Sequence, residues 1–175
     1  WRSITNTEMN IEDFVIVDDF LNQSEFYDVS SYITPSNVPW IHQSSGEKKG
    51  LKFLFHDCTG KKFYNTVIFE KIKRITEKDY VIKDIYFNGQ WPGRDGIFHI
   101  DECDFTVLLY VSDYDPEWGG FTHFINSNNP KDHLAIPPIT NRLVIFPSHI
   151  RHKAYSFCSQ DCPMRISLTF KLDKK

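Results

Sequence analysis

Two histidines and one aspartate are the residues of this chain whose types and spacing favour metal chemistry. His99 and Asp101 occupy alternate positions of one short segment, and His152 follows much later. In an extended strand, residues i and i+2 point to the same face about 6.5 Å apart, so His99 and Asp101 can share one ion. With His152 they would cover one face of an octahedral Fe(II) ion and leave positions open for a small molecule and O2.

Two histidines could supply the third ligand, because His149 lies three residues before His152. Residues 146–148 are predicted to end a strand and turn, and residues 152–154 to begin the next strand, which favours His152. His123 lies on a separate strand and is interpreted as part of a barrel wall or as facing a substrate. The His-x-Asp pair alone would also fit a hydrogen-bonded pair at a strand end.

The composition limits the classes of protein. A chain of 175 residues suits one domain, which would bury about 70% of the surface exposed by its unfolded form. The formal charge is -3 with acids and bases interspersed, which disfavours nucleic acid as a partner. No apolar run approaches the ~20 residues that cross a bilayer, and no signal-peptide core follows the first residues. The sequence therefore predicts a cytoplasmic protein with no membrane partner, and it leaves the oligomeric state open.

The four cysteines argue against a structural zinc site. Cys58, Cys103, Cys158 and Cys162 do not form two CxxC pairs. We expect free thiols. A hairpin disulfide between Cys158 and Cys162 in an oxidising compartment stays open as the alternative.

The N-terminal third is predicted to contain a strand and two helices. A β-rich run at residues 11–21 precedes Asn22, which is a candidate N-cap for a helix that extends to Ser31. Residues 59–76 carry apolar residues near the helical period and are predicted to form an amphipathic helix. The apolar positions of that helix are Phe63, Val67, Ile68, Ile72 and Ile75.

After Glu77 the pattern changes to short runs rich in Val, Ile, Tyr, Phe and Thr, separated by Gly, Pro, Asp and Asn. Eight such runs fit the two packed sheets of a jelly roll. The predicted strands are residues 80–88, 96–100, 105–112, 120–125, 133–136, 142–147, 153–158 and 164–172.

The predicted architecture is mainly β with flanking helices, in the α+β class. A double-stranded β-helix, which is the cupin-like jelly roll, would span residues 80–172. Residues 1–79 would form an N-terminal α/β support region, and the whole chain, 1–175, would be one domain. In this arrangement the strand ends that carry His-x-Asp and His152 lie at the same mouth of the barrel.

The order of these motifs resembles the Fe(II)/2-oxoglutarate-dependent dioxygenase superfamily, and within it the prolyl-4-hydroxylase-like branch. The resemblance covers roughly residues 80–172. Its motifs are Phe98-His99-Ile100-Asp101, residues 105–111, Trp118-Gly119-Gly120 with residues 121–124, residues 142–148, residues 152–156 and residues 164–170.

The resemblance implies a catalytic iron site held by His99, Asp101 and His152, with Fe(II), the cosubstrate 2-oxoglutarate and O2. It implies hydroxylation of an unactivated C–H bond with release of succinate and CO2. The substrate would be a protein side chain, a free amino acid or another small metabolite.

Arg165 occupies the place of the family's basic residue for the distal carboxylate of 2-oxoglutarate, and a guanidinium suits that role because it donates two parallel hydrogen bonds. A surface arginine at a strand edge is the alternative. Ser167 shares a strand face with Arg165. Tyr86, Asn88 and Tyr110 are further predicted contacts of the cosubstrate.

Two features separate this chain from many prolyl hydroxylases, in which a lysine follows the distal histidine by about ten residues. Here the basic residue is an arginine, Arg165, thirteen residues after His152, and Ser167 follows it as in other branches. Proline is therefore not assumed as the substrate. Two other functions stay open, namely a non-catalytic cupin-like domain that binds a metal or small molecule, and a metal-dependent isomerase.

Overall fold

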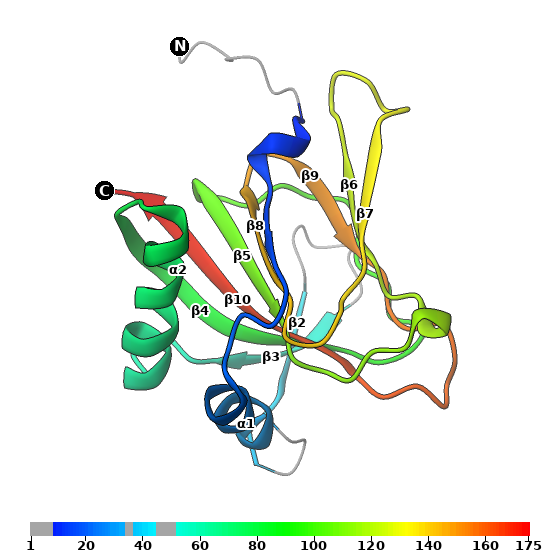
Figure 1. Cartoon of the computed structure of the whole chain (residues 1–175). Helices are drawn as coiled ribbons and strands as arrows, with labels where there is room; N and C mark the ends of the chain where they lie inside the picture. Colours follow the sequence, from blue (N-terminus) through cyan, green and yellow to red (C-terminus); the bar gives the residue numbers. More distant parts are fainter. Residues whose placement is uncertain (1–8, 34–36, 45–51) are drawn as a thin grey trace.

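Two antiparallel sheets face each other in the computed structural model, which describes residues 9–33, 37–44 and 52–175 (Figure 1). The larger sheet has the order β1-β8-β5-β10-β4-β3-β2, and the smaller one has the order β7-β6-β9. This is the predicted double-stranded β-helix. The strands are β1 (Val15–Val17), β2 (Ile41–Ser44), β3 (Lys52–Asp57), β4 (Tyr80–Gln90), β5 (Phe105–Tyr110), β6 (Thr122–Ile125), β7 (His133–Ile136), β8 (Leu143–Pro147), β9 (Arg151–Ala154) and β10 (Arg165–Lys174).

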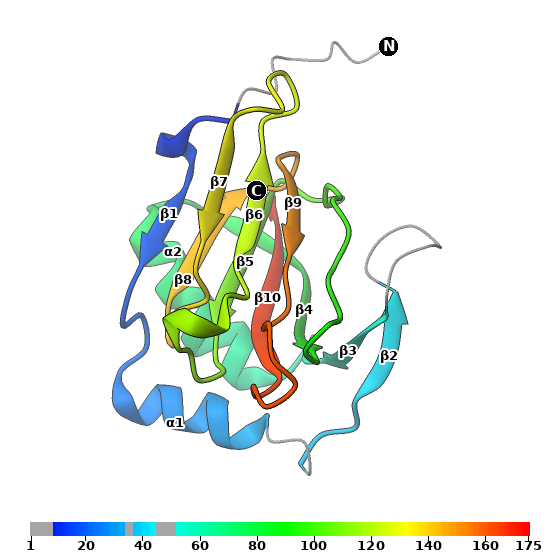
Figure 2. The same cartoon turned by 90° about the vertical axis from the view of Figure 1, so that its right-hand side faces the viewer.

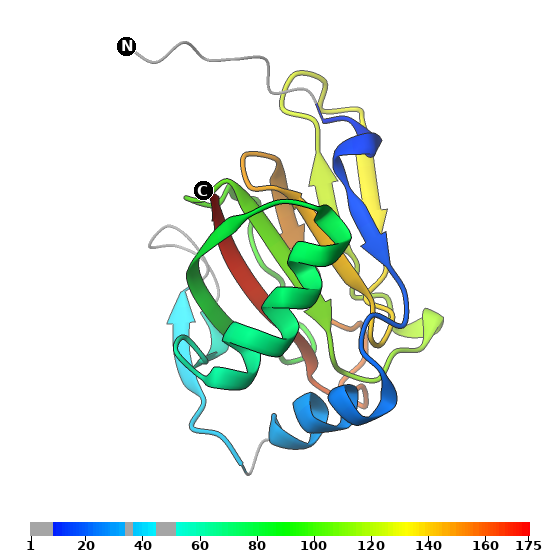
Figure 3. The same cartoon turned by 60° about the vertical axis from the view of Figure 1, so that its left-hand side comes forward.

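The two faces of the larger sheet have different coverings. The smaller sheet lies in front of one face, as Figure 2 shows. Helices α1 (Gln23–Tyr32) and α2 (Phe69–Thr76) lie on the other side, with α2 running across the sheet (Figure 3). No helix in the described ranges is long and apolar enough to cross a membrane.

The N-terminal region contributes strands as well as helices to this arrangement. Strand β1 pairs with β8, while β2 and β3 extend the sheet beyond β4. The predicted strand and helix at the start of the chain are confirmed. Helix α1 begins after Asn22, whose side chain accepts a hydrogen bond from the backbone of Glu25, while the Glu25 side chain accepts one from the backbone of Asn22. This reciprocal pair satisfies two N–H groups that the first turn of a helix leaves free.

The second predicted helix differs from expectation in its first half. A π-helical segment, Tyr64–Ile68, precedes α2. The wider π turn shifts the register of the side chains relative to a continuous α-helix. Two of the apolar positions of the predicted amphipathic helix, Val67 and Ile75, are 38% and 40% exposed. The buried side chains of this helical region are Tyr64, Ile68, Phe69 and Ile72.

Two predicted strands beside the metal-binding residues also need correction. Residues 96–100 do not form a strand, because their contacts with β9 amount to an isolated bridge between His99 and His152 and one bond from Gly96 to Ala154. The strand predicted at residues 153–158 is β9, Arg151–Ala154, which begins earlier because it pairs with β6. His152 is therefore inside the strand and pairs with Phe124.

Strand β10 separates the hydrophobic core from the interior of the barrel. Its apolar side chains, including Leu168 and Phe170, are fully buried in the core beneath the helices. Alternate residues of a strand point to opposite faces, so the other set points between the sheets. That set consists of Arg165, Ser167, Thr169 and Lys171, all of which line one cavity.

Candidate metal centre and cavity

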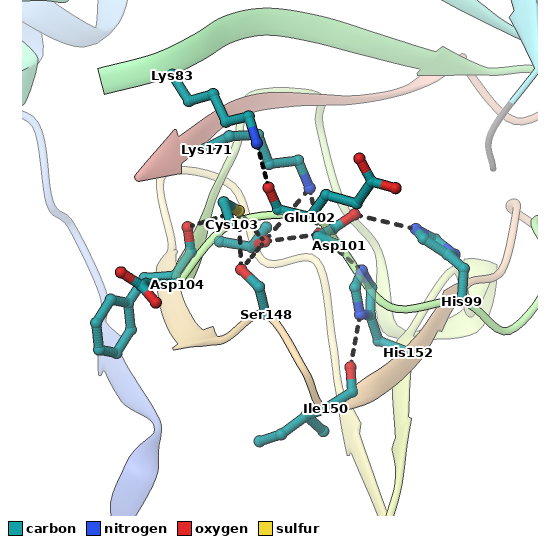
Figure 4. Close-up of polar contacts among 12 residues, drawn as sticks. Lys83, His99, Asp101, Glu102, Cys103, Asp104, Ser148, Ile150, His152 and Lys171 are labelled. Carbon is teal, nitrogen blue, oxygen red and sulfur yellow. Dashed lines mark hydrogen bonds and ion pairs between the residues drawn. The ribbon is translucent and has the colours of Figure 1, made fainter. Parts of the chain in front are cut away.

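The side chains of His99, Asp101 and His152 point toward one another, as Figure 4 shows. One potential ligand atom from each residue lies within 4.8 Å of the others. Nε2 of His99 is 3.6 Å from Oδ1 of Asp101, and Nε2 of His152 is 3.4 Å from Oδ2 of the same carboxylate. His152 is carried by β9, whereas His99 and Asp101 lie on the connection between β4 and β5. Two nitrogens and a carboxylate on one side of an ion form a facial ligand set.

Backbone carbonyls orient both imidazoles. Nδ1 of His99 lies 2.9 Å from the carbonyl oxygen of Ile97, and Nδ1 of His152 lies 2.9 Å from that of Ile150. A carbonyl oxygen only accepts, so Nδ1 carries the proton and Nε2 presents its lone pair to the cluster. Burial and the neighbouring His152 lower the pKa of His99, which favours the neutral imidazole that binds metals.

Asp101 is held through both its backbone and its carboxylate. Its amide N–H donates to the carbonyl oxygen of Ser148 at 3.0 Å. The Thr106 hydroxyl donates to Oδ2 at 2.6 Å, and the Lys171 ammonium contacts the same oxygen. Burial by itself would raise the pKa of the Asp101 carboxyl, but His152 and Lys171 outweigh it and keep the pKa well below its ordinary value. The carboxylate is therefore ionised and available to a cation.

Arg165 is a fully buried cation in the barrel. Its Nε donates to the carbonyl oxygen of Gly120 at 2.8 Å, and its terminal nitrogens donate to Oε1 of Gln90 and Oγ1 of Thr122, each at 2.9 Å. All three acceptors are neutral, and no carboxylate in the described part of the chain pairs with Arg165. A guanidinium has five N–H donors, so two remain after these three bonds.

One cavity of about 1200 Å³ connects Arg165 with the metal-binding cluster. Tyr86, Asn88 and Ser167 line it, whereas Tyr110 lies beneath the guanidinium of Arg165, 5.1 Å from ring centre to Cζ. The Tyr110 hydroxyl hydrogen-bonds Thr122 at 2.8 Å. The structure therefore brings four of the five predicted cosubstrate residues to the cavity wall and places Tyr110 behind one of them.

Four other residues weighed from the sequence, His149, His123, Cys158 and Cys162, do not line this cavity. His149 is exposed, and His123 packs against Tyr155 with ring centres 4.7 Å apart. Cys158 and Cys162 are free thiols, one exposed and one buried. Cys103 lies at the cavity wall, with its sulfur 3.0 Å from the Ser148 hydroxyl.

Sequence reasoning missed the polar residues that support the cluster. Gln90 and Thr122 hold Arg165, while Thr106, Ser148 and Lys171 hold Asp101. Strand alternation could have identified Lys171, which lies six residues after Arg165 on the same face of β10. Gln90, Thr122 and Ser148 make contacts between segments that are distant in the chain, and such contacts leave no local pattern.

Residues 92–171 match the family model described as the 2OG-Fe(II) oxygenase superfamily. No curated protein sequence matches the chain. A Pseudomonas putida prolyl-4-hydroxylase structure matches with a TM-score of 0.70 at 14% identity, covering 93% of each chain.

Two further similar structures contain a bound peptide or small molecule. A Trichoplax adhaerens prolyl hydroxylase in complex with a hypoxia inducible factor peptide matches with a TM-score of 0.71 at 19% identity, covering 94% of this chain and 85% of that one. HygX from Streptomyces hygroscopicus, with nickel, 2-oxoglutarate and hygromycin B bound, matches with a TM-score of 0.69 at 7% identity, covering 95% and 88%. At these identities the likeness establishes a shared fold.

Proposed function

We propose that this chain is an Fe(II)- and 2-oxoglutarate-dependent hydroxylase, since residues 92–171 match the family model of the 2OG-Fe(II) oxygenase superfamily. The observation that carries the proposal is the combination in one cavity of the His99, Asp101 and His152 cluster with a buried arginine that has no anionic partner among the described residues. The cluster suits a metal cation, and the arginine suits a carboxylate.

The donor set fits Fe(II). Two neutral imidazole nitrogens and one ionised carboxylate are hard and intermediate ligands of the kind that bind this ion, and they leave its other positions open. His99, Asp101 and His152 would hold the iron, which would supply O2 activation when 2-oxoglutarate is bound. The chain's own contribution is to fix the Nε2 atoms of both histidines by their Nδ1 hydrogen bonds and to exclude bulk water.

Arg165 would bind the distal carboxylate of 2-oxoglutarate. An isolated charge is costly to bury, and an anionic ligand would offset that cost through the two free N–H donors. Ser167 and Asn88 occupy paired positions of β10 and β4, and Tyr86 pairs with Thr169 in the next row. The Thr169 hydroxyl is buried and has no hydrogen-bond partner, so the wall between the arginine and the metal centre offers polar groups to a dicarboxylate.

Tyr110 supports the cosubstrate through Arg165 in this proposal. Its ring lies under the guanidinium, and its hydroxyl orients Thr122, which accepts a hydrogen bond from the same guanidinium. Loss of the Tyr110 hydroxyl would therefore weaken 2-oxoglutarate binding by loosening Arg165 rather than by removing a direct contact.

The substrate would be a protein side chain, a free amino acid or another small metabolite. Peptide and small-molecule complexes among the structures of the same fold support both classes. The interspersed charges and the net charge of -3 favour these substrates over nucleic acid. All four cysteines are free, which supports a reducing compartment such as the cytoplasm.

An anaerobic titration tests the metal and cosubstrate sites. We expect Fe(II) plus 2-oxoglutarate to produce a visible charge-transfer band that His99→Ala abolishes. Arg165→Met should raise the Kd for 2-oxoglutarate roughly a hundredfold, since a buried charge-assisted contact is lost. His149→Ala and Arg94→Met are matched controls because both side chains are exposed. A folded, metal-loaded wild-type protein without the band would contradict the proposal.

Succinate formation then distinguishes an enzyme from a cupin-like binding domain. Wild-type protein, Fe(II), ascorbate, O2 and 2-oxoglutarate are incubated with pools of amino acids, peptides and small metabolites. A pool that raises succinate release above the substrate-free rate, in wild type but not in His152→Ala, identifies the substrate class. A protein that shows the band but releases no succinate with any pool would favour the non-catalytic function.

A further inference from the structure

Lys171 reaches into the metal-binding cluster from the last strand. Its side chain is only 12% exposed, and its ammonium contacts Oδ2 of Asp101 (Figure 4). The same ammonium lies 3.3 Å from the Thr106 hydroxyl. Lys171 and Thr106 are paired neighbours on β10 and β5, so both are aimed at one carboxylate oxygen by the register of the sheet.

The two oxygens of Asp101 are therefore not equivalent. Oδ2 accepts from Thr106 and contacts Lys171, and a carboxylate oxygen has about two lone-pair directions. Oδ1 accepts no hydrogen bond from the described residues and lies nearest to Nε2 of His99. The oxygen that keeps its lone pairs for a cation is Oδ1.

Lys171 pairs with only one of two nearby carboxylates, those of Asp84 and Asp101. Asp84 is its cross-strand neighbour on β4 and offers an exposed carboxylate to the ammonium. The ion pair in the structure is instead with Asp101, which is mostly buried. A second lysine, Lys83, contacts the neighbouring Glu102 through its carbonyl oxygen and leaves the Asp101 carboxylate alone.

We propose that Lys171 is a positioning residue. Together with Thr106 it occupies the lone pairs of Oδ2 of Asp101, so that this carboxylate binds the metal through Oδ1 alone. The inference rests on the proposed function. An octahedral ion has six positions, of which two histidines and one carboxylate oxygen fill three and a chelating 2-oxoglutarate fills two. One position stays open for O2 only when Asp101 contributes a single oxygen.

A second consequence concerns metal affinity. The ammonium of Lys171 places a positive charge beside the bound cation in a partly buried site, where like charges repel more strongly than in water. Lys171 therefore weakens metal binding while it keeps a coordination position free. Removing the charge of Lys171 should therefore tighten metal binding and make the sixth coordination position less accessible to O2.

The test compares Lys171→Met with Lys171→Arg, Thr106→Val and the control Lys83→Met. Lys83 is a lysine of the same cavity wall that does not contact the Asp101 carboxylate. The readouts are the Kd for Mn(II), measured from free Mn(II) by electron paramagnetic resonance, and the signal of the nitric oxide adduct of Fe(II) with 2-oxoglutarate. Neither readout depends on turnover, and circular dichroism checks that each variant is folded.

We expect Lys171→Met to bind Mn(II) roughly tenfold more tightly than wild type and to lose most of the nitric oxide adduct. Thr106→Val should lose part of the adduct, while Lys171→Arg and Lys83→Met should stay within about threefold of wild type in both readouts. Wild-type values for both Lys171→Met and Thr106→Val would overturn the inference. Wild-type protein that binds no metal would instead contradict the proposed function.

Discussion

The guanidinium of Arg165 is fully buried and is held by neighbouring groups on several sides. Its three neutral acceptors and the ring of Tyr110 stabilise the charge without neutralising it. Burial lowers the pKa of Arg165 from its ordinary value, but an arginine stays protonated in proteins. Such a cation is ready for an anion at little cost of rearrangement, since its donors are already oriented.

Gly120 is essential to that orientation. It has φ +75°, its carbonyl accepts from Arg165, and a Cβ built on it would lie 2.6 Å from Cδ1 of Phe157. We expect Gly120→Ala to lower the free energy of unfolding by about 2–4 kcal/mol through strain and overpacking. It should also raise the Kd for 2-oxoglutarate by displacing Arg165. Urea denaturation and the charge-transfer titration measure the two effects.

Gly119→Ala is the matched control for this prediction. Gly119 has φ +70°, but a Cβ there would meet no atom within 4 Å. This variant should therefore show the backbone strain alone, about 1–3 kcal/mol at a φ of 70° and a ψ of -122°, with an unchanged Kd. Equal effects of the two substitutions would show that contact with Phe157 is unimportant.

At the level of elements, β10 organises both the core and the cavity. It lies between β4 and β5, so its register determines how the side chains of all three strands align with one another. A slip of one residue would send Leu168 and Phe170 into the cavity and Arg165 into the core. The apolar set beneath the helices thereby secures the register that aims Arg165 and Lys171.

The junction between β1 and α1 depends on one side chain from the turn before β8. The Asn141 side chain accepts from the amide of Leu21 at 3.0 Å and donates to its carbonyl at 2.8 Å, while its own backbone has φ +62°. We expect Asn141→Ala to lower the free energy of unfolding by about 2–3 kcal/mol, because both hydrogen bonds are lost and alanine is strained at positive φ.

Asn141→Gly separates these two causes. Glycine adopts positive φ without strain, so this variant should lose only the hydrogen bonds and be destabilised by about 1–2 kcal/mol. Chemical denaturation of both variants provides the comparison, and metal binding should stay at the wild-type level. Alanine and glycine variants of equal stability would show that the backbone conformation of Asn141 adds no strain.

For the whole molecule, the candidate metal centre is where separate parts of the fold meet. His152 belongs to the smaller sheet, Arg165 and Lys171 belong to the larger one, and His99 and Asp101 lie on a connection between strands. A bound metal and cosubstrate would therefore tie the two sheets together. Ligands that bind only the folded state also stabilise it by mass action.

Thermal unfolding tests this coupling without turnover. At a hundred times the Kd, Mn(II) should stabilise the wild-type protein by about 2.7 kcal/mol, and 2-oxoglutarate should add a further increment. His152→Ala should lose the metal-dependent increment, and a chelator should restore the melting temperature of the metal-free wild type. An increment that survives in His152→Ala would place the metal elsewhere.

Much of the secondary structure could be predicted because it depends on residues that are close together in the chain. Short runs rich in β-branched and aromatic residues predicted β4, β5 and β10, and Asn22 predicted the start of α1. The spacing of His99 and Asp101 predicted that the two side chains could converge. The same local reasoning failed where neighbours decide the conformation, as in the isolated bridge at His99 and the π turn that exposes Val67.

The sequence by itself predicted the jelly-roll class and a set of residues, His99, Asp101 and His152, that could share a metal, and its resemblance to a family assigned Arg165 to a carboxylate. Only the tertiary structure decided that Arg165 is buried without an anionic partner among the described residues, that Tyr110 lies behind it, and that Lys171 contacts Asp101. The reason is physical. Alternation and capping depend on residues a few positions apart, whereas burial and ion pairing depend on sheet register between segments distant in the chain.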